Sequence, residues 1–322
     1  MLLNPAKLAR LPSQKYNRGD LAAQWLNSNI FENRTFKSMS NGDLPYIIIN
    51  ASDINTGMTF SFIQQQFDFL CSDISDYPVA NAVTASSAVP GVFAPITLNN
   101  FQGECTRKTE LWNSWVKDSL EHDSIYQRRL QVARAIERYY DPQNMPKVRL
   151  VDGGVTDNLG VRGSMMSPVA HYGNVKEMRG AFTPEALSKV KRVLVIVANA
   201  QSYVDYDWSK AGTEPGIIKT VSASFNAAIG ILNSESITLA KRGFEQWRQY
   251  TNKQRAPAVP KVKVYFSTLT FEQIRGDKKR DYFNAIPTTF NLSDQHIASV
   301  RQLAGDLMDD SPEFQAFKKT FE

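Results

Sequence analysis

The chain has 322 residues, of which 42% are hydrophobic and 21% are charged. These proportions match ordinary globular proteins and exclude disordered, collagen-like and coiled-coil classes. The net charge of +5 is a mild positive bias, which favours only weak attraction to anionic surfaces. No apolar run in the sequence approaches the roughly 20 residues that cross a bilayer. No secretory signal is visible in residues 1–10, where polar residues interrupt the apolar run.

Hydrophobic periodicity predicts a chain of strands and helices. In the first half of the chain, the expected elements are a helix at 20–29, a strand at 46–49, a return strand at 58–63, a helix at 78–88, an extended segment at 92–96, one or two surface helices within 108–140 and a strand at 148–151. In the second half, they are helices at 160–171 and from Thr183, a strand at 192–197, a long helix or broken pair at 216–250, a strand at 261–266 and a final helix from Ser293 to 309. Strands separated by helices favour an α/β fold with a parallel sheet. Four main strands make a small sheet for so many helices.

A carboxylate and two glycines follow one of the predicted strands. The apolar run 147–151 ends at Asp152, and Gly153 and Gly154 come next. In open α/β sheets, ligands bind at the carboxyl ends of strands, so a carboxylate there can act as a base. Glycines let the backbone turn sharply. Asp-Gly is also an ordinary way to leave a strand, so this motif is weak when it stands alone.

Other catalytic signatures are absent from the sequence. It contains no Gly-x-Ser-x-Gly nucleophile elbow and no phosphate-binding glycine loop. His122, His171 and His296 lie far apart and fit no metal-ligand pattern, so we expect no metal site and no cofactor. The two cysteines, Cys71 and Cys105, are compatible with one disulfide or with two free thiols.

The most basic part of the chain is residues 241–281, with eleven lysines or arginines against four acidic residues. Its densest part, Arg275-Gly-Asp-Lys-Lys-Arg280, lacks interleaved aromatics, and the segment matches no nucleic-acid-binding module. We therefore interpret it as a solvated basic face and expect no nucleic-acid partner.

Three segments share a resemblance to one family. They are Asp152-Gly-Gly-Val-Thr-Asp-Asn158, Ala85-Ser-Ser-Ala-Val-Pro-Gly91 and Asn50-Ala-Ser-Asp-Ile-Asn-Thr-Gly57. Together they resemble patatin-like phospholipases, and the flanking residues resemble a bacterial branch of that family. The resemblance implies an α/β, three-layer fold with a mainly parallel central sheet flanked by helices. It also implies a lipid acyl hydrolase that works through a Ser-Asp dyad.

The resemblance assigns roles to the residues of this motif. Asp152 would be the proton acceptor of the dyad, and Gly153 and Gly154 would allow the close approach of backbone and substrate. Asp157 and Asn158 would support the motif, or would be turn residues that bond their own backbone. Ser86 and Ser87 are read as helix-end residues near the site, because neither sits in a strand-to-helix elbow.

The serine elbow and the glycine-rich oxyanion loop of the family have no counterpart in this sequence. We therefore expect residues 1–322 to be the C-terminal portion of a single patatin-like domain, with a helical insertion at about 106–142 and the first strands missing. Such a chain would carry only the Asp half of the dyad and be inactive alone. The alternative is a non-catalytic lipid-binding or interaction protein.

The expected partners are a lipid or acyl-ester substrate and a membrane surface contacted peripherally. The resemblance points to a bacterial envelope or membrane-associated location, with any signal upstream of residue 1.

Overall fold

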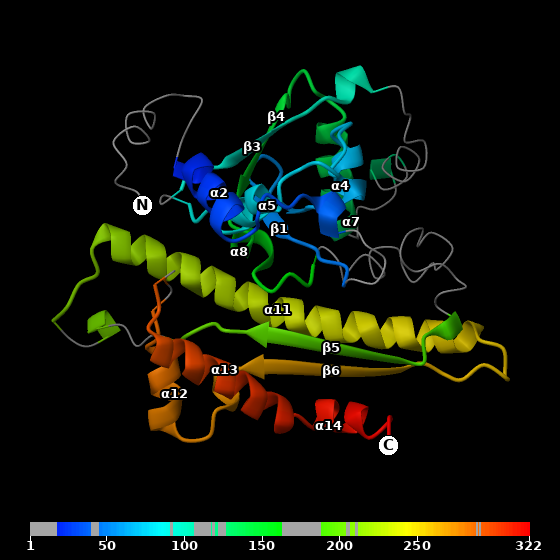
Figure 1. Ribbon diagram of the computed structural model, residues 1–322, viewed down its shortest axis with the longest axis vertical. Coiled ribbons are helices and arrows are strands. Elements are labelled where there is room, and N and C mark those ends of the chain that lie inside the picture. Colours follow the sequence, from blue (N-terminus) through cyan, green and yellow to red (C-terminus); the bar gives the residue numbers. More distant parts are fainter. Residues whose placement is uncertain are drawn as a thin grey trace. The chain divides into compact units, whose positions relative to one another are not determined.

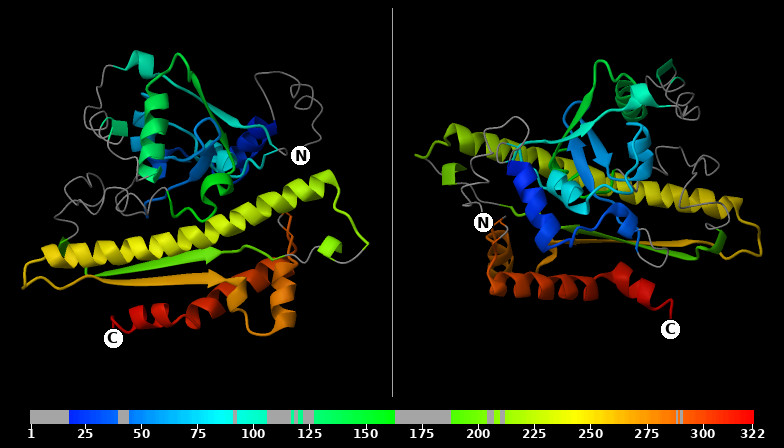
Figure 2. Two further views of the ribbon diagram at one scale, coloured as in Figure 1. Left: turned by 180° about the vertical axis from the view of Figure 1, so that it is seen from behind. Right: turned by 45° about the horizontal axis from the view of Figure 1, so that its top comes forward.

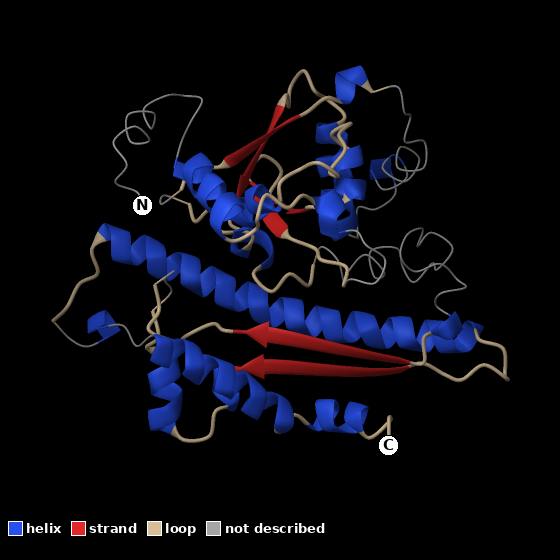
Figure 3. Ribbon diagram, in the orientation of Figure 1, coloured by secondary structure: helices blue, strands red, loops and turns tan. Residues whose placement is uncertain are grey.

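The computed structural model describes residues 18–39, 45–90, 93–105, 117, 120–121, 127–162, 188–203, 207–209, 212–287, 289 and 291–322. The fold is of the mixed α/β class (Figure 3). The chain divides into two compact units, Met1–Ser164 and Met165–Glu322. No helix among the described residues is long and apolar enough to cross a membrane.

The first unit contains a four-stranded antiparallel sheet. Its strands are β1 (Asn50–Asp53), β2 (Met58–Ser61), β3 (Ile96–Asn99) and β4 (Lys147–Val151), in the order β2-β1-β4-β3. Every neighbouring pair runs antiparallel, so the expectation of a mainly parallel central sheet is wrong for this unit. The residues between β1 and β2 show the physical reason. They form a tight turn in which Gly57 has a φ of +71°, and so short a connection can only join antiparallel strands.

The predicted strand at 46–49 is shifted along the chain. Pairing with β2 begins at Asn50 and pairing with β4 at Ser52, while Tyr46 and Ile47 lie outside the sheet and are 69% and 49% exposed. Three consecutive isoleucines indicated a buried strand, but the residues that pair are the polar-looking Asn50–Asp53, of which Ala51, Ser52 and Asp53 are buried. The return strand was correctly predicted at β2.

Helices complete the first unit. They are α2 (Arg18–Asn29), α3 (Phe36–Met39), α4 (Gln64–Asp68), α5 (Val79–Ser86), the 3-10 turn η1 (Gln102–Glu104), α7 (Gln127–Tyr139) and α8 (Gly154–Asp157). The predicted helices at 20–29 and 78–88 correspond to α2 and α5. Aromatic rings fill much of the core, and Phe60 packs edge-on against Phe62 and Phe67.

The helix α7 is part of this core, although its segment was expected to be a surface insertion. Ala133, Ile136 and Tyr139 are buried in the main cluster, with Tyr139 only 2% exposed. The Tyr139 hydroxyl donates a hydrogen bond of 2.9 Å to Oδ2 of Asp53 on β1. The helix therefore anchors the sheet through both apolar burial and a buried polar contact. Most of 106–126 lies outside the described residues.

The second unit contains a parallel pair of strands, β5 (Arg192–Asn199) and β6 (Lys263–Thr270), which were predicted at 192–197 and 261–266. The helix α11 (Ile217–Gln254) runs along them (Figure 1 and Figure 2). It is one 38-residue helix, not a broken pair. Its Trp247 and Phe244 pack with Val262 and Val264.

The remaining helices of this unit follow β6. They are the 3-10 turn η3 (Phe271–Gln273), α12 (Asp277–Asn284), α13 (Asp294–Asp309) and α14 (Pro312–Lys318), and the short turn η2 (Asp207–Ser209) precedes α11. Ser293 caps α13 as predicted, because its Oγ accepts from the His296 N–H at 3.2 Å. That helix is not the last one, since α14 follows it. The expected helices at 160–171 and from Thr183 lie mostly outside the described residues.

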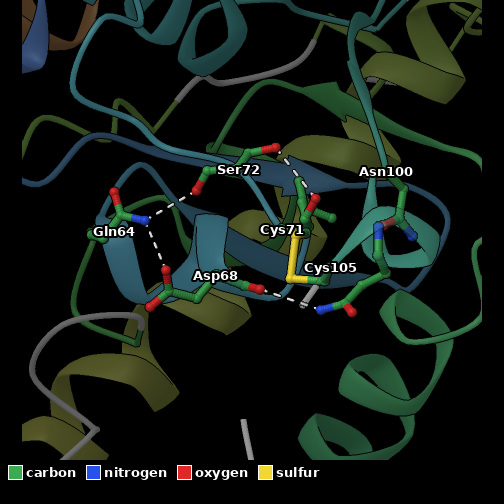
Figure 4. Close-up of a disulfide and its surroundings, with 8 residues drawn as sticks. Gln64, Asp68, Cys71, Ser72, Asn100 and Cys105 are labelled. Carbon is green, nitrogen blue, oxygen red and sulfur yellow. Dashed lines mark hydrogen bonds between the residues drawn. A yellow bond between two sulfur atoms is a disulfide. The ribbon is translucent and has the colours of Figure 1, made fainter. Parts of the chain in front are cut away.

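A disulfide closes a loop in the first unit. Cys71 and Cys105 are bonded with a Cα–Cα distance of 5.5 Å and a sequence separation of 34 (Figure 4). Neighbouring side chains also link this loop. Gln64 donates to Asp68 Oδ1 at 2.7 Å and to the Ser72 carbonyl at 3.0 Å, and Gln102 donates to the Asp68 carbonyl at 3.3 Å. Of the two alternatives that the cysteine count left open, the structure has the disulfide.

Reduction of this disulfide should lower the free energy of unfolding by about 2–4 kcal/mol, because a closed loop of this length restricts the unfolded chain. Urea unfolding with and without dithiothreitol measures the difference. The double variant C71A/C105A should match the reduced protein and be insensitive to the reductant. Two titratable thiols in the denatured, unreduced protein would contradict the disulfide.

Candidate functional site

The candidate site forms where β4 ends against helix α5. Asp152 follows directly after Val151, the last residue of β4. Its backbone N–H donates to the Ala88 carbonyl at 3.0 Å, and the next N–H, of Gly153, donates to the Ser86 carbonyl at 3.1 Å. The end of α5 is thus bonded to the end of β4. Ser86 was interpreted as a helix-end residue near the site, and these bonds confirm that it lies beside the aspartate motif.

The Asp152 carboxylate is partly shielded and has few partners. Its Oδ1 accepts a hydrogen bond of 2.8 Å from the Gly154 N–H. Burial raises the pKa of Asp152, and the Gly154 N–H opposes that rise. Within the described residues, Asp152 forms no ion pair and no hydrogen bond to another side chain. A carboxylate with a raised pKa and a free oxygen is a better proton acceptor than a fully paired one.

Gly153 is required by a close approach between backbones. A Cβ atom at this position would lie 2.6 Å from the carbonyl oxygen of Asn50 on β1. Gly154 is less constrained. A Cβ there would meet only the side-chain oxygens of Asn158, at 2.9 Å, and Asp152, at 3.0 Å, which can move. The first glycine therefore fixes the turn, whereas the second keeps space open next to the carboxylate.

Asp157 holds the turn that follows the motif. It is 4% exposed, its Oδ1 accepts from the Val161 N–H at 3.1 Å and its Oδ2 from the Arg162 N–H at 2.6 Å. This arrangement fits the interpretation of Asp157 as a turn residue that bonds its own backbone. Asn158 is exposed and lies next to Gly154. Neither side chain is hydrogen-bonded to the Asp152 carboxylate among the described residues, and a role of either in supporting the motif stays a prediction.

Sequence reasoning missed a hydroxyl cluster beneath the motif. Ser52 Oγ is fully buried, lies 2.8 Å from Thr156 Oγ1 and accepts from the Thr156 N–H at 3.1 Å. Thr59 Oγ1 lies 3.1 Å from the same Thr156 oxygen. These contacts join β1, β2 and α8 around the Asp152 turn. The only sequence signal was the match over residues 50–57, which gave no indication that Ser52 points towards Thr156.

A second buried carboxylate, Asp53, also went unassigned. Asn55 N–H donates to it at 2.9 Å, Thr56 Oγ1 at 2.7 Å and the Tyr139 hydroxyl at 2.9 Å. Burial raises the pKa of Asp53, and these hydrogen bonds, first that of Thr56, lower it. Because its oxygens are occupied, Asp53 is suited to holding the β1–β2 turn rather than to taking a proton.

The nearby serines do not form a dyad with Asp152. The Ser87 hydroxyl donates to the Val83 carbonyl at 2.9 Å, within α5. No serine hydroxyl in the described part of the chain is hydrogen-bonded to the Asp152 carboxylate. The described residues also contain no group of three or more His, Cys, Asp or Glu side chains that could hold a metal ion. Among the described residues, the site therefore has one candidate base and no serine hydroxyl that is bonded to it as a nucleophile.

Comparison with known proteins gives no family: no family model, no curated protein and no solved structure matches this chain.

The variant G153A should lose about 1–3 kcal/mol of unfolding free energy, because the new methyl group would press on the Asn50 carbonyl and force the backbones apart. The matched variant G154A should stay within about 1 kcal/mol of wild type, because only mobile side-chain ends must yield. Denaturant unfolding of both variants measures the contrast. Equal stability of the two would contradict the close approach at Gly153.

The variant D152N should gain stability relative to wild type as the pH rises. A folded-state pKa above the unfolded value gives wild type a stability that is present at low pH and is lost as the pH rises through the folded pKa. The asparagine variant has no such loss, and its Oδ1 can still accept from Gly154. Unfolding free energies of both proteins from about pH 3 to pH 7 measure the difference.

Asp141 supplies a control of opposite sign, because hydrogen bonds from Asn144 lower the pKa of its exposed carboxyl. D141N should therefore lose stability relative to wild type as the pH rises through the same range. A D152N difference that follows the direction of D141N would contradict the raised pKa of Asp152.

Proposed function

We propose that this chain carries the acid–base half of a lipid acyl hydrolase, with Asp152 as the proton acceptor for a serine outside the described residues. The observation that carries the proposal is the Asp152 carboxylate itself: half-buried, bonded to a single backbone N–H and free of any positive partner in the described chain. Such a group can hydrogen-bond a hydroxyl and take its proton.

The patatin-like resemblance supports the same proposal from the sequence. The segments that carry it, at residues 50–57, 85–91 and 152–158, come together around the end of β4. The antiparallel sheet of the first unit departs from the sheet that the family implies, so the proposal depends on this local cluster rather than on the fold.

In the proposed reaction, the serine attacks the ester carbonyl while Asp152 takes its proton, and backbone N–H donors stabilise the tetrahedral oxyanion. Collapse expels the alcohol, which receives the proton, and leaves an acyl-enzyme. Water then attacks the acyl-enzyme, and Asp152 takes a proton from that water. The fatty acid is released and the serine regains its proton. A raised pKa brings Asp152 closer to the range in which a base is effective at neutral pH.

The disulfide supports an extracytoplasmic location for this activity. Disulfides persist in oxidising compartments such as the bacterial periplasm and cell surface, and are rare in the cytosol. We therefore propose an envelope or membrane-associated site of action on lipid or acyl-ester substrates.

The test begins with the reading frame upstream of Met1 in the source genome. If that frame encodes a Gly-x-Ser-x-Gly, the longer protein should hydrolyse p-nitrophenyl butyrate. Its D152N variant should lose at least about 100-fold in turnover, the usual minimum contribution of a general base. The neighbouring variant N158A should stay within a few fold of wild type.

The 322-residue chain alone should show no turnover above that of its own D152N variant. Turnover by this chain that D152N abolishes would place the nucleophile within residues 1–322 and contradict the half-dyad. An upstream frame without a serine elbow would favour the alternative, a lipid-binding protein without catalysis.

A further inference from the structure

The second unit has an open sheet edge that the proposed hydrolase chemistry does not use. In the parallel pair, the Lys263 N–H donates to the Lys191 carbonyl of the segment leading into β5. Alternate residues of a strand direct their N–H and C=O groups to opposite edges. The odd-numbered residues of β6 therefore bond to β5, and the even-numbered ones, Val264, Phe266 and Thr268, point to the other edge. No described residue pairs with that edge along these three positions.

A groove runs along this edge. It has a volume of about 850 Å³, and three consecutive residues of β6, Val264, Tyr265 and Phe266, form its floor. One wall is α11, with Phe244 at its base, and the other is α14, with Pro312 and Ala316. Residues of both strand faces line the groove together, which places the groove at the edge of the strand, between residues of the two helices.

The two helix walls limit what can pair with β6. They pack on opposite faces of the strand: Phe266 contacts Phe244 of α11, and Tyr265 contacts Phe317 of α14. A second copy of this unit would carry a helix on each face of its own β6, so it has less freedom to approach the edge than a single strand has. A single extended peptide carries no such layers and can enter between them.

The charges on the α11 wall favour an acidic occupant. Lys241 and Arg242 are exposed and form no ion pair with any residue that the structure describes. The nearby Glu245 is already compensated by Arg248, whose Nε lies 2.8 Å from Oε2, and this interaction lowers the pKa of Glu245 to about 2. On the α14 wall, the apolar Pro312 and Ala316 flank the single carboxylate of Glu313.

We propose that this groove binds an extended peptide segment of a partner protein, which adds to β6 as a third strand. Its backbone would bond to the outward groups of Val264 and Phe266, which line the groove. Its acidic side chains would face Lys241 and Arg242 on α11, and its alternate, apolar side chains would face α14. Main-chain bonding gives such strand addition its affinity, and alternate side chains give it specificity.

The probe for this site is a fluorescein-labelled octapeptide of alternating glutamate and valine, measured by fluorescence anisotropy with the full chain. We expect saturable binding with a Kd below about 1 mM. A lysine–valine octapeptide should bind at least about fivefold more weakly, because it places cations against the α11 wall.

N-methylated peptides test strand addition without altering the protein. One carries N-methyl groups on its glutamates and the other on its valines. Each peptide therefore lacks the backbone N–H donors along one of its own two edges. One of them should lose at least about tenfold in affinity, and the other should stay within about twofold of the parent. Equal affinities of the two would overturn the proposal, because a side-chain-driven contact does not distinguish the two edges.

Protein variants locate the contact. K241E should lower the affinity for the glutamate–valine peptide about fivefold. K253E, a matched charge reversal on the same helix away from the groove, should leave that affinity unchanged. V264P removes an outward N–H that has no described partner, and it should lower the affinity for the glutamate–valine peptide at least about tenfold. Absence of saturable binding, or equal binding by K241E and K253E, would overturn the proposal. The groove belongs to residues 241–316, so these results are independent of the role of Asp152.

Discussion

Two backbone hydrogen bonds hold the candidate site together: those from Asp152 N–H to Ala88 and from Gly153 N–H to Ser86. They attach the end of α5 to the end of β4 and fix the direction of the Asp152 side chain. The close approach of Gly153 to the Asn50 carbonyl then fits β1 against the same turn. The buried contacts of Ser52 and Thr156 depend on this fit, because they bridge β1 and α8 across the motif.

Two partly or fully buried carboxylates in the first unit show how environment separates their roles. Asp53 receives hydrogen bonds from Asn55, Thr56 and Tyr139 and ties α7 to the β1–β2 turn. Among the described residues, Asp152 receives one, from the Gly154 N–H, while burial raises its pKa. Folding alone explains the first carboxylate, since its oxygens are satisfied. Burial disfavours the charge of the second carboxylate, and among the described residues only the Gly154 N–H offsets this effect, a pattern typical of charges that serve function.

The sequence predicted elements better than their arrangement. Periodicity located α2, α5, β2, β4, β5, β6 and the Ser293 cap, because burial on one face and capping are local properties. The polar turn and the return strand of the β1–β2 hairpin were also predicted, and that pair is antiparallel. The antiparallel pairing of β4 with β1 and β3 joins distant segments, and it was missed because the prediction of a parallel sheet relied on strands alternating with helices. The strand at 46–49 was misplaced because three isoleucines outweighed the polar residues that pair. At the site, Asp152 and its glycines could be selected from the motif, but the contact of Thr156 with Ser52 and that of Tyr139 with Asp53 join distant segments and needed the fold.

Burial makes Asp152, which has no ion-pair partner among the described residues, easier to protonate than an ordinary aspartate. NMR titration of ¹³C-labelled aspartate carboxyls, with the Asp152 signal assigned by its loss in D152N, measures this directly. The account predicts an Asp152 pKa clearly above the usual aspartate value of 3.8. A pKa at or below that value would reveal a positive or hydrogen-bonding partner that stabilises the charge, and would contradict Asp152 as the base.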